Sequence, residues 1–149
     1  MSIKEMIQDH PAVGDDYNEQ LGEAVKHAMY GAAILNSCAD ACMEEVRAGH
    51  HDMQMLANCI RRCLDASDAC TAFYRVGSRR TGHNVAAIKA VGAAAIIACQ
   101  ECLEECSQHD NAHCRRCAQM CREVIEDVTK ATQGLTPRHG QDRATAQYS

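Results

Sequence analysis

The sequence has no tryptophan and only one phenylalanine in 149 residues. This shortage of large rings leaves little bulk for a conventional core, because aromatic side chains bury the most area. The net charge of −5 argues against a nucleic-acid-binding surface, which needs a clustered excess of Lys and Arg. No segment alternates apolar and polar residues with a period of two, so the sequence indicates no strands.

Targeting signals are also missing. The N-terminal stretch MSIKEMIQDHP has neither the basic region nor the apolar region of a secretory signal. No apolar run approaches the roughly 20 residues that span a bilayer. We therefore expect a cytoplasmic protein, in a compartment that keeps thiols reduced, with no membrane partner and no nucleic acid.

Cysteine, by contrast, is abundant and helically spaced. The runs are Cys38-x3-Cys42, Cys59-x3-Cys63, Cys99-x2-Cys102-x3-Cys106 and Cys114-x2-Cys117-x3-Cys121, and Cys70 follows Cys63 by seven positions. Steps of three, four and seven keep side chains on one face of an α-helix. The odd total of eleven, and the strain of a disulfide between positions i and i+4, argue against a disulfide framework.

Capping residues and glycines divide the chain into a short helix and four long ones. Ser2-x-x-Glu5 predicts the short helix, which ends before Pro11, and Asp16-x-x-Glu19 predicts a capping box for the first long helix. The expected long helices span about residues 17–47, 53–76, 83–107 and 112–132, with Asp52 and Asn111 as caps of the second and fourth.

Short loops between long amphipathic helices favour an all-α fold, an antiparallel up-down-up-down four-helix bundle. We expect a single domain over residues 1–132 and a disordered polar tail over residues 133–149. Antiparallel packing places ten cysteines at one end of the bundle, with Cys70 at the boundary. The other end is an expected apolar core of Leu21, Leu35, Phe73, Val85, Ile88, Val124 and Val128.

Thiols that line a narrow interior suit a soft metal ion. Facing thiolates repel one another, so the metal-free thiols are expected to be largely protonated. Each Cu(I) displaces a proton, neutralises one thiolate and accepts two or three sulfur ligands. If thiolates bridge the ions, charge balance predicts about one Cu(I) per cysteine.

Other interpretations of the cysteines stay open. A zinc site at Cys99, Cys102, Cys114 and Cys117 leaves seven cysteines unexplained, and the ferredoxin-type iron–sulfur run is absent. The sequence shows no recognisable Ser/His/Asp triad or pair of catalytic carboxylates, so we expect that the protein is not an enzyme. The alternatives to a copper store are a copper- or zinc-binding module of low stoichiometry and a thiol-redox protein, which needs an exposed cysteine of low pKa.

Over about residues 1–132 the chain resembles the cytosolic branch of the cysteine-rich four-helix-bundle copper storage proteins. The resemblance is carried by the segment KEMIQDHP, by Cys38-Ala-Asp-Ala-Cys42 and by the stretch from Cys99 to Cys121. It implies a cytosolic homo-oligomer, often a tetramer, that holds multiple Cu(I) ions inside the bundle. It implies that the Cu(I)-ligand positions are Cys38, Cys42, Cys59, Cys63, Cys70, Cys99, Cys102, Cys106, Cys114, Cys117 and Cys121. His109 and His113 resemble histidines at the open end, where copper is expected to enter.

The sequence also departs from fuller members of that family. They carry cysteine further along the first long helix, where this chain has Ala24, Ala28, Gly31 and Leu35. Beyond Cys121 the fourth helix has valine at positions 124 and 128. The sequence therefore predicts a bundle in which one half holds copper.

Two further groups of residues lie outside the cysteine runs. His50, His51, Met53 and Met55 are interpreted as exposed residues in or beside a loop at the cysteine-rich end. The apolar residues Ile34, Val91, Ile96, Ile97 and Ile125 are expected to flank the core, and some of them to build an oligomer interface.

Overall fold

The structure is a computed structural model that describes residues 1–80 and 83–137. Within those residues the chain forms five α-helices and no strand. The helices are α1 (Ile3–Gln8), α2 (Glu19–Arg47), α3 (Met53–Gly77), α4 (Val85–Cys106) and α5 (Ala112–Gln133), and one 3₁₀ turn spans Gly14–Asp16. The predicted all-α fold is confirmed.

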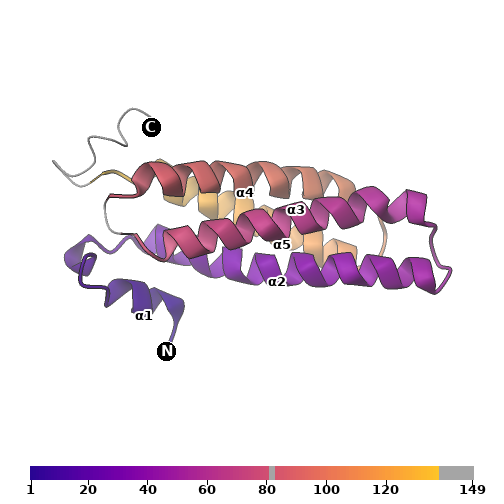
Figure 1. Cartoon of the computed structure of the whole chain (residues 1–149), viewed down its shortest axis with the longest axis horizontal. Coiled ribbons are helices and arrows are strands. Elements are labelled where there is room, and N and C mark those ends of the chain that lie inside the picture. The colour runs from indigo at the N-terminus through magenta and orange to yellow at the C-terminus, as the bar shows by residue number, and fades with distance from the viewer. Residues whose placement is uncertain (81–82, 138–149) are drawn as a thin grey trace.

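The four long helices form an antiparallel bundle (Figure 1). Helix α2 packs against α3 and α5, and α4 packs against the same two helices, as an up-down-up-down order requires. The α2–α3 and α4–α5 connections lie at one end of the bundle, and the start of α2 and the end of α5 lie at the other end. The short helix α1 packs against the outside of α2.

Two of the predicted caps are present. Ser2 and Glu5 form a capping box, in which Ser2 Oγ accepts from the Glu5 N–H at 3.2 Å and Glu5 Oε2 accepts from the Ser2 N–H at 2.6 Å. Asp52 caps α3 through the Met55 N–H at 2.7 Å. Each bond satisfies an amide that the helix itself leaves unpaired.

The predicted start of α2 is wrong. Asp16 belongs to the preceding 3₁₀ turn, and Asn18 caps the helix, with its Oδ1 accepting from the Leu21 N–H at 3.0 Å. Helix α4 starts at Val85, two residues after the predicted start. Asn111 precedes α5 as predicted but makes no side-chain cap bond.

The last helix ends one residue beyond the predicted end, and the domain boundary itself stays a prediction. Helix α5 runs to Gln133, and Leu135 is buried in the core. The rest of the predicted tail, residues 138–149, lies outside the described residues, so the tail's disorder stays a prediction.

All seven residues predicted for the apolar end of the core are completely buried. Close approach of the helices compensates for the shortage of aromatic bulk. A Cβ atom at Gly92 of α4 would lie 2.8 Å from Cγ2 of Thr132 on α5, and one at Gly31 of α2 would lie 3.0 Å from Cγ2 of Val124. Glycine at these two positions lets neighbouring helices pack closely.

Helix α4 is long and apolar enough to cross a membrane by length and composition, a test that core helices of water-exposed proteins also pass. Here it forms one wall of the bundle and buries Val85, Ile88 and Ala95. Lys89, Gln100 and Glu101 interrupt the helix, so the sequence shows no unbroken apolar run there. The outer face of α4 is apolar as well, with Ala90, Ala94 and Ile97 exposed.

Candidate metal centre

All eleven cysteines are buried, and none forms a disulfide. They lie on the inward faces of α2, α3, α4 and α5, in the half of the bundle that ends at the α2–α3 and α4–α5 connections. We call this end the thiol end, and the eleven sulfurs the thiol row. The structure therefore gathers every cysteine that the sequence indicated.

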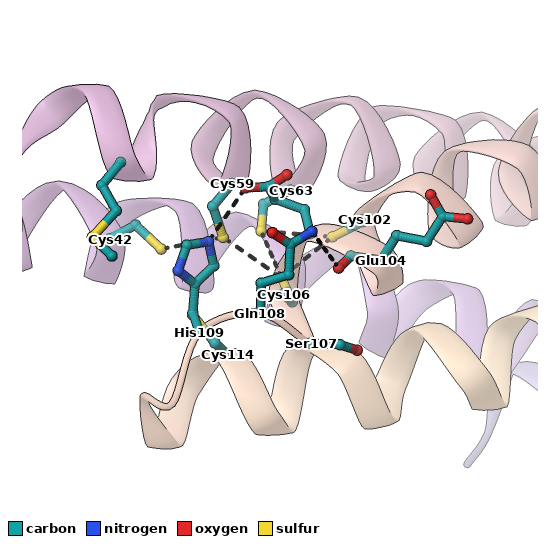
Figure 2. Close-up of polar contacts among 12 residues, drawn as sticks. Cys42, Cys59, Cys63, Cys102, Glu104, Cys106, Ser107, Gln108, His109 and Cys114 are labelled. Carbon is teal, nitrogen blue, oxygen red and sulfur yellow. Dashed lines mark hydrogen bonds and ion pairs between the residues drawn. The ribbon is translucent and has the colours of Figure 1, made fainter.

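The centre of the thiol row is a cluster of four sulfurs from three helices. Cys63 of α3, Cys102 and Cys106 of α4, and Cys117 of α5 have all six of their Sγ–Sγ distances between 3.5 and 3.8 Å. Figure 2 shows the sulfurs of Cys63 and Cys102 turned toward that of Cys106. The four sulfurs form a nearly regular tetrahedron.

The size of this tetrahedron matches metal–thiolate chemistry. The centre of a regular tetrahedron with such edges lies about 2.3 Å from each corner, the usual zinc–thiolate bond length. The centre of each triangular face lies about 2.1 Å from its three sulfurs, which is close enough for three-coordinate binding of a soft ion. The side chains are thus spaced for a metal ion before one binds.

Toward the thiol end the row continues through α2 and α5. Cys59 lies 3.7 Å from Cys42 and 3.6 Å from Cys106. Ligand atoms of Cys38, Cys42, His113 and Cys114 all lie within 4.8 Å of one another, and Cys38 also belongs to such a group with Cys63, Cys106 and Cys117. Cys38 therefore links the outer group to the central cluster.

In the opposite direction the row runs deeper into the bundle. Cys102, Cys117 and Cys121 form a further group within 4.8 Å, and Cys70 lies 3.7 Å from Cys99. Cys99 in turn interacts with Cys121. Cys70, which the sequence placed at the boundary, is thus in contact with the rest of the row.

Mutual hydrogen bonding and burial determine how these thiols ionise. The pKa of Cys70 is raised above its usual value, first by the hydrogen bond with Cys99 and then by burial, which disfavours the thiolate. The pKa of Cys121 is raised by hydrogen bonds with Cys102 and Cys117 and by burial. Thiols of this kind give up their protons when a metal ion replaces them.

His113 lies at the outer limit of the thiol row, and the role in copper entry that the family resemblance implies for it stays a prediction. It belongs to the first turn of α5, and its Nδ1 lies 3.4 Å from Cys38 Sγ and 3.5 Å from Cys114 Sγ. Its Nε2 faces Glu45 Oε1 at 3.4 Å. The ring thus has one nitrogen toward the thiols and one toward a carboxylate.

His109 occupies a different position. It lies on the α4–α5 connection (Figure 2), and its Nε2 is 3.3 Å from Glu105 Oε1. It lines a surface pocket of about 520 Å³ together with Cys106 and Arg115. Among the described residues, the groups of possible metal ligands include His113 but not His109.

Sequence reasoning missed Glu45. A glutamate near the end of a helix is usually an exposed charge, and nothing in the spacing marks this one. Its Oε2 lies 2.7 Å from Nδ1 of His50, and the pKa of Glu45 is lowered mainly by that contact. His50 is exposed, as interpreted from the sequence, and it also contacts Glu45.

Comparison with known proteins agrees with this arrangement. The family model described as Csp, copper storage protein, matches residues 17–133. A structure of the copper storage protein Ccsp from Streptomyces lividans, described as loaded with 10 copper equivalents, superimposes with a TM-score of 0.78. It is 30% identical in sequence, and the match covers 90% of this chain and all of that one.

Two further matches extend the comparison. A second structure is described as copper loading to a cytosolic copper storage protein from Streptomyces lividans, with five coppers. It superimposes with a TM-score of 0.71 and is 32% identical in sequence, and the match covers 79% of this chain and 96% of that one. An uncharacterized cysteine-rich protein of Bacillus subtilis, YhjQ, is 31% identical over 104 residues, 70% of this chain and 85% of that protein.

Proposed function

This chain belongs to the copper storage protein family, and from that premise we propose that it stores multiple Cu(I) ions in the cytoplasm on the thiolates of the thiol row. The observation that carries the proposal is the continuity of the row. Neighbouring Sγ atoms from four helices repeat at 3.5 to 3.7 Å from Cys42 through Cys59 and Cys106 to Cys117. Cys121 lies within 4.8 Å of Cys117 and interacts with Cys99, which lies 3.7 Å from Cys70. Such spacing lets one thiolate bridge two ions, because Cu(I) accepts two or three sulfurs.

The proposed ligands are the eleven cysteines. Cys38 and Cys117 each belong to two of the ligand groups, so each is placed to bridge neighbouring ions. Neutralisation of eleven thiolates by monovalent ions gives a capacity on the order of ten Cu(I) per chain. The apolar half adds no ligand, because Leu35, Phe73 and Val124 fill it.

The outer face of α4 supports assembly of several copies. Ala90, Ala94 and Ile97 leave an apolar strip exposed, and the small alanines allow another helix to approach closely. An exposed apolar strip of this kind is typical of an interaction surface. We infer a homo-oligomer, with the tetramer that the family resemblance implies as its expected size.

An anaerobic titration of reduced protein with Cu(I), in competition with a chromophoric chelator, tests the storage role. We expect on the order of ten ions retained per chain. Retention of only one or two ions would show that the chain is not a store. A double variant, Cys102→Ala with Cys117→Ala, is the matched control, because it removes two sulfurs of the central tetrahedron and should lower the number retained by at least two.

The tetrahedron of Cys63, Cys102, Cys106 and Cys117 favours a second candidate, a single Zn²⁺ site. Its centre-to-sulfur distance of about 2.3 Å equals that of structural zinc sites. Two net negative charges would then remain in a buried site, a cost that monovalent copper avoids. Co²⁺ discriminates between the two: one equivalent bound with the intense visible bands of tetrahedral thiolate coordination would favour the zinc role.

The redox alternative finds less support. A thiol-redox protein needs an accessible cysteine of low pKa, and all eleven cysteines of this chain are buried. Storage assigns no catalytic step to any residue. Alkylation of the folded, metal-free protein should therefore give no single fast-reacting thiol.

A further inference from the structure

Glu45 is a half-buried carboxylate in the last two turns of α2, and it touches two histidines at once. Its Oε2 lies 2.7 Å from Nδ1 of His50, and its Oε1 lies 3.4 Å from Nε2 of His113. Together with Glu44 these three residues line a surface pocket of about 280 Å³. The carboxylate therefore connects an exposed imidazole with one that reaches the thiol row.

The His113 ring is held between opposite partners. Nδ1 lies within 3.5 Å of the sulfurs of Cys38 and Cys114, whereas Nε2 is buried and makes no standard hydrogen bond with the described residues. The charged group that Nε2 faces is the Glu45 carboxylate. A neutral imidazole carries its single proton on one nitrogen and a lone pair on the other.

Only one of the two tautomers suits this setting. A proton on Nε2 points at the Glu45 carboxylate and leaves the Nδ1 lone pair directed toward Cys38 and Cys114. A proton on Nδ1 would instead set the Nε2 lone pair against a negative charge. Histidines that bind metals commonly donate their other N–H to a carboxylate, which fixes the tautomer and makes the ring a stronger ligand.

We propose that Glu45, braced by His50, is a positioning residue that fixes His113 as the Nε2–H tautomer and so readies Nδ1 to take an incoming Cu(I) and pass it to Cys38 and Cys114. This assignment rests on the proposed copper function for its purpose, but the tautomer is a property of the metal-free chain. His50 holds the second carboxylate oxygen and keeps the first in place beside His113.

Glu44 provides a matched control. It is the preceding residue on the same helix, it is also a glutamate, and its carboxylate pairs with Arg47 on the surface rather than with a histidine. Glu44→Ala therefore removes the same charge and the same side chain from the same turn without touching His113.

The experiment has two readouts. The first is ¹H–¹⁵N NMR of the histidine rings in reduced, metal-free protein, with the His113 signals assigned by a His113→Gln variant. The second is the rate at which the first Cu(I) equivalent passes from a chromophoric chelator to the protein, measured by stopped-flow absorbance. Wild type and Glu44→Ala should show the Nε2–H tautomer, whereas Glu45→Ala should show a mixture of tautomers.

Glu45→Ala should also slow the uptake of the first equivalent roughly 10- to 100-fold, the usual effect of removing such a partner. Glu45→Gln should retain the tautomer, because the amide oxygen can still accept from Nε2. The total number of ions retained should not change, since no thiol is removed.

An unchanged tautomer in Glu45→Ala would overturn the assignment, and so would a rate of first-equivalent uptake equal to that of Glu44→Ala. The readouts also separate this inference from the storage proposal. A chain that retains only one or two ions, yet shows the tautomer change, would end the storage proposal and support the role of Glu45.

Discussion

Replacement of Phe73 by alanine tests whether the apolar half and the thiol half of the bundle are energetically separate. Phe73 is the only phenylalanine and is fully buried in α3. Its ring lies against two glycines, 4.0 Å from a Cβ built at Gly77 and 3.4 Å from one built at Gly92. Truncation leaves a cavity that few neighbouring side chains can fill, at a typical cost of about 3–5 kcal/mol. For a chain of this size the cost lowers the Tm by roughly 10 °C.

The number of Cu(I) ions retained by Phe73→Ala should not change, because every proposed ligand lies from Cys70 toward the thiol end. Cys102→Ala is the opposite control. It removes one sulfur, which costs about 1 kcal/mol as for a deleted methylene, but it should lower the number of ions retained by at least one. Urea unfolding of reduced, metal-free protein followed by circular dichroism gives the stabilities, and chelator competition gives the copper. The reasoning fails if folded Phe73→Ala loses more than one ion, or if the two variants lose equal stability.

Metal-free protein should lose stability as the pH rises above the usual thiol pKa of 9.0. The pKa values of Cys70 and Cys121 are raised in the folded chain, so the unfolded chain releases these two protons first. Below that pH the contribution is fully present, and copper-loaded protein should lack the effect; urea unfolding at several pH values measures both. Ile97→Glu should shift the protein toward monomers in size-exclusion chromatography with light scattering, with the same copper per chain. Met43→Glu, which alters another exposed apolar residue on α2, should leave the assembly intact.

The fold was predictable because helical spacing and short connections leave few ways to bury one face of each helix. The seven predicted residues of the apolar core are all buried for that reason. The start of α2 was not predictable, because it depends on tertiary contacts. Tyr17 packs over Gly22, and Lys4 of α1 pairs with Glu23 at 2.5 Å, so that the chain turns once more before Asn18 begins the helix.

The candidate site was predictable only in part. Spacing along each helix identified which residues face inward and which end they share. The contact between Cys70 and Cys99 depends on how far α3 is shifted along its axis relative to α4. The residue spacing within one helix does not determine this shift. Glu45 was missed for a similar reason, since its role depends on His113 of α5 and His50 of a loop.

Cysteines line only one half of the bundle interior, and Gly31 marks where the thiol row could be lengthened. A Cβ at Gly31 would lie 3.6 Å from Cys70 Sγ but only 3.0 Å from Cγ2 of Val124. Gly31→Cys alone should therefore be destabilised by crowding, at a typical cost of about 1–3 kcal/mol. The double variant Gly31→Cys with Val124→Ala removes the crowding atom and should retain one more Cu(I) than Val124→Ala alone, measured by chelator competition.

The comparison tests why the proposed copper ligands end near Cys70. If the double variant folds as stably as Val124→Ala and gains an ion, then the number of adjacent sulfurs limits capacity, and the valine and glycine pair marks where the row ends. If the double variant folds but gains no ion, then an additional sulfur close to Cys70 is not sufficient to bind another Cu(I). Access or charge, rather than sulfur spacing, would then set the limit, because a new thiol next to Cys70 supplies everything that spacing requires.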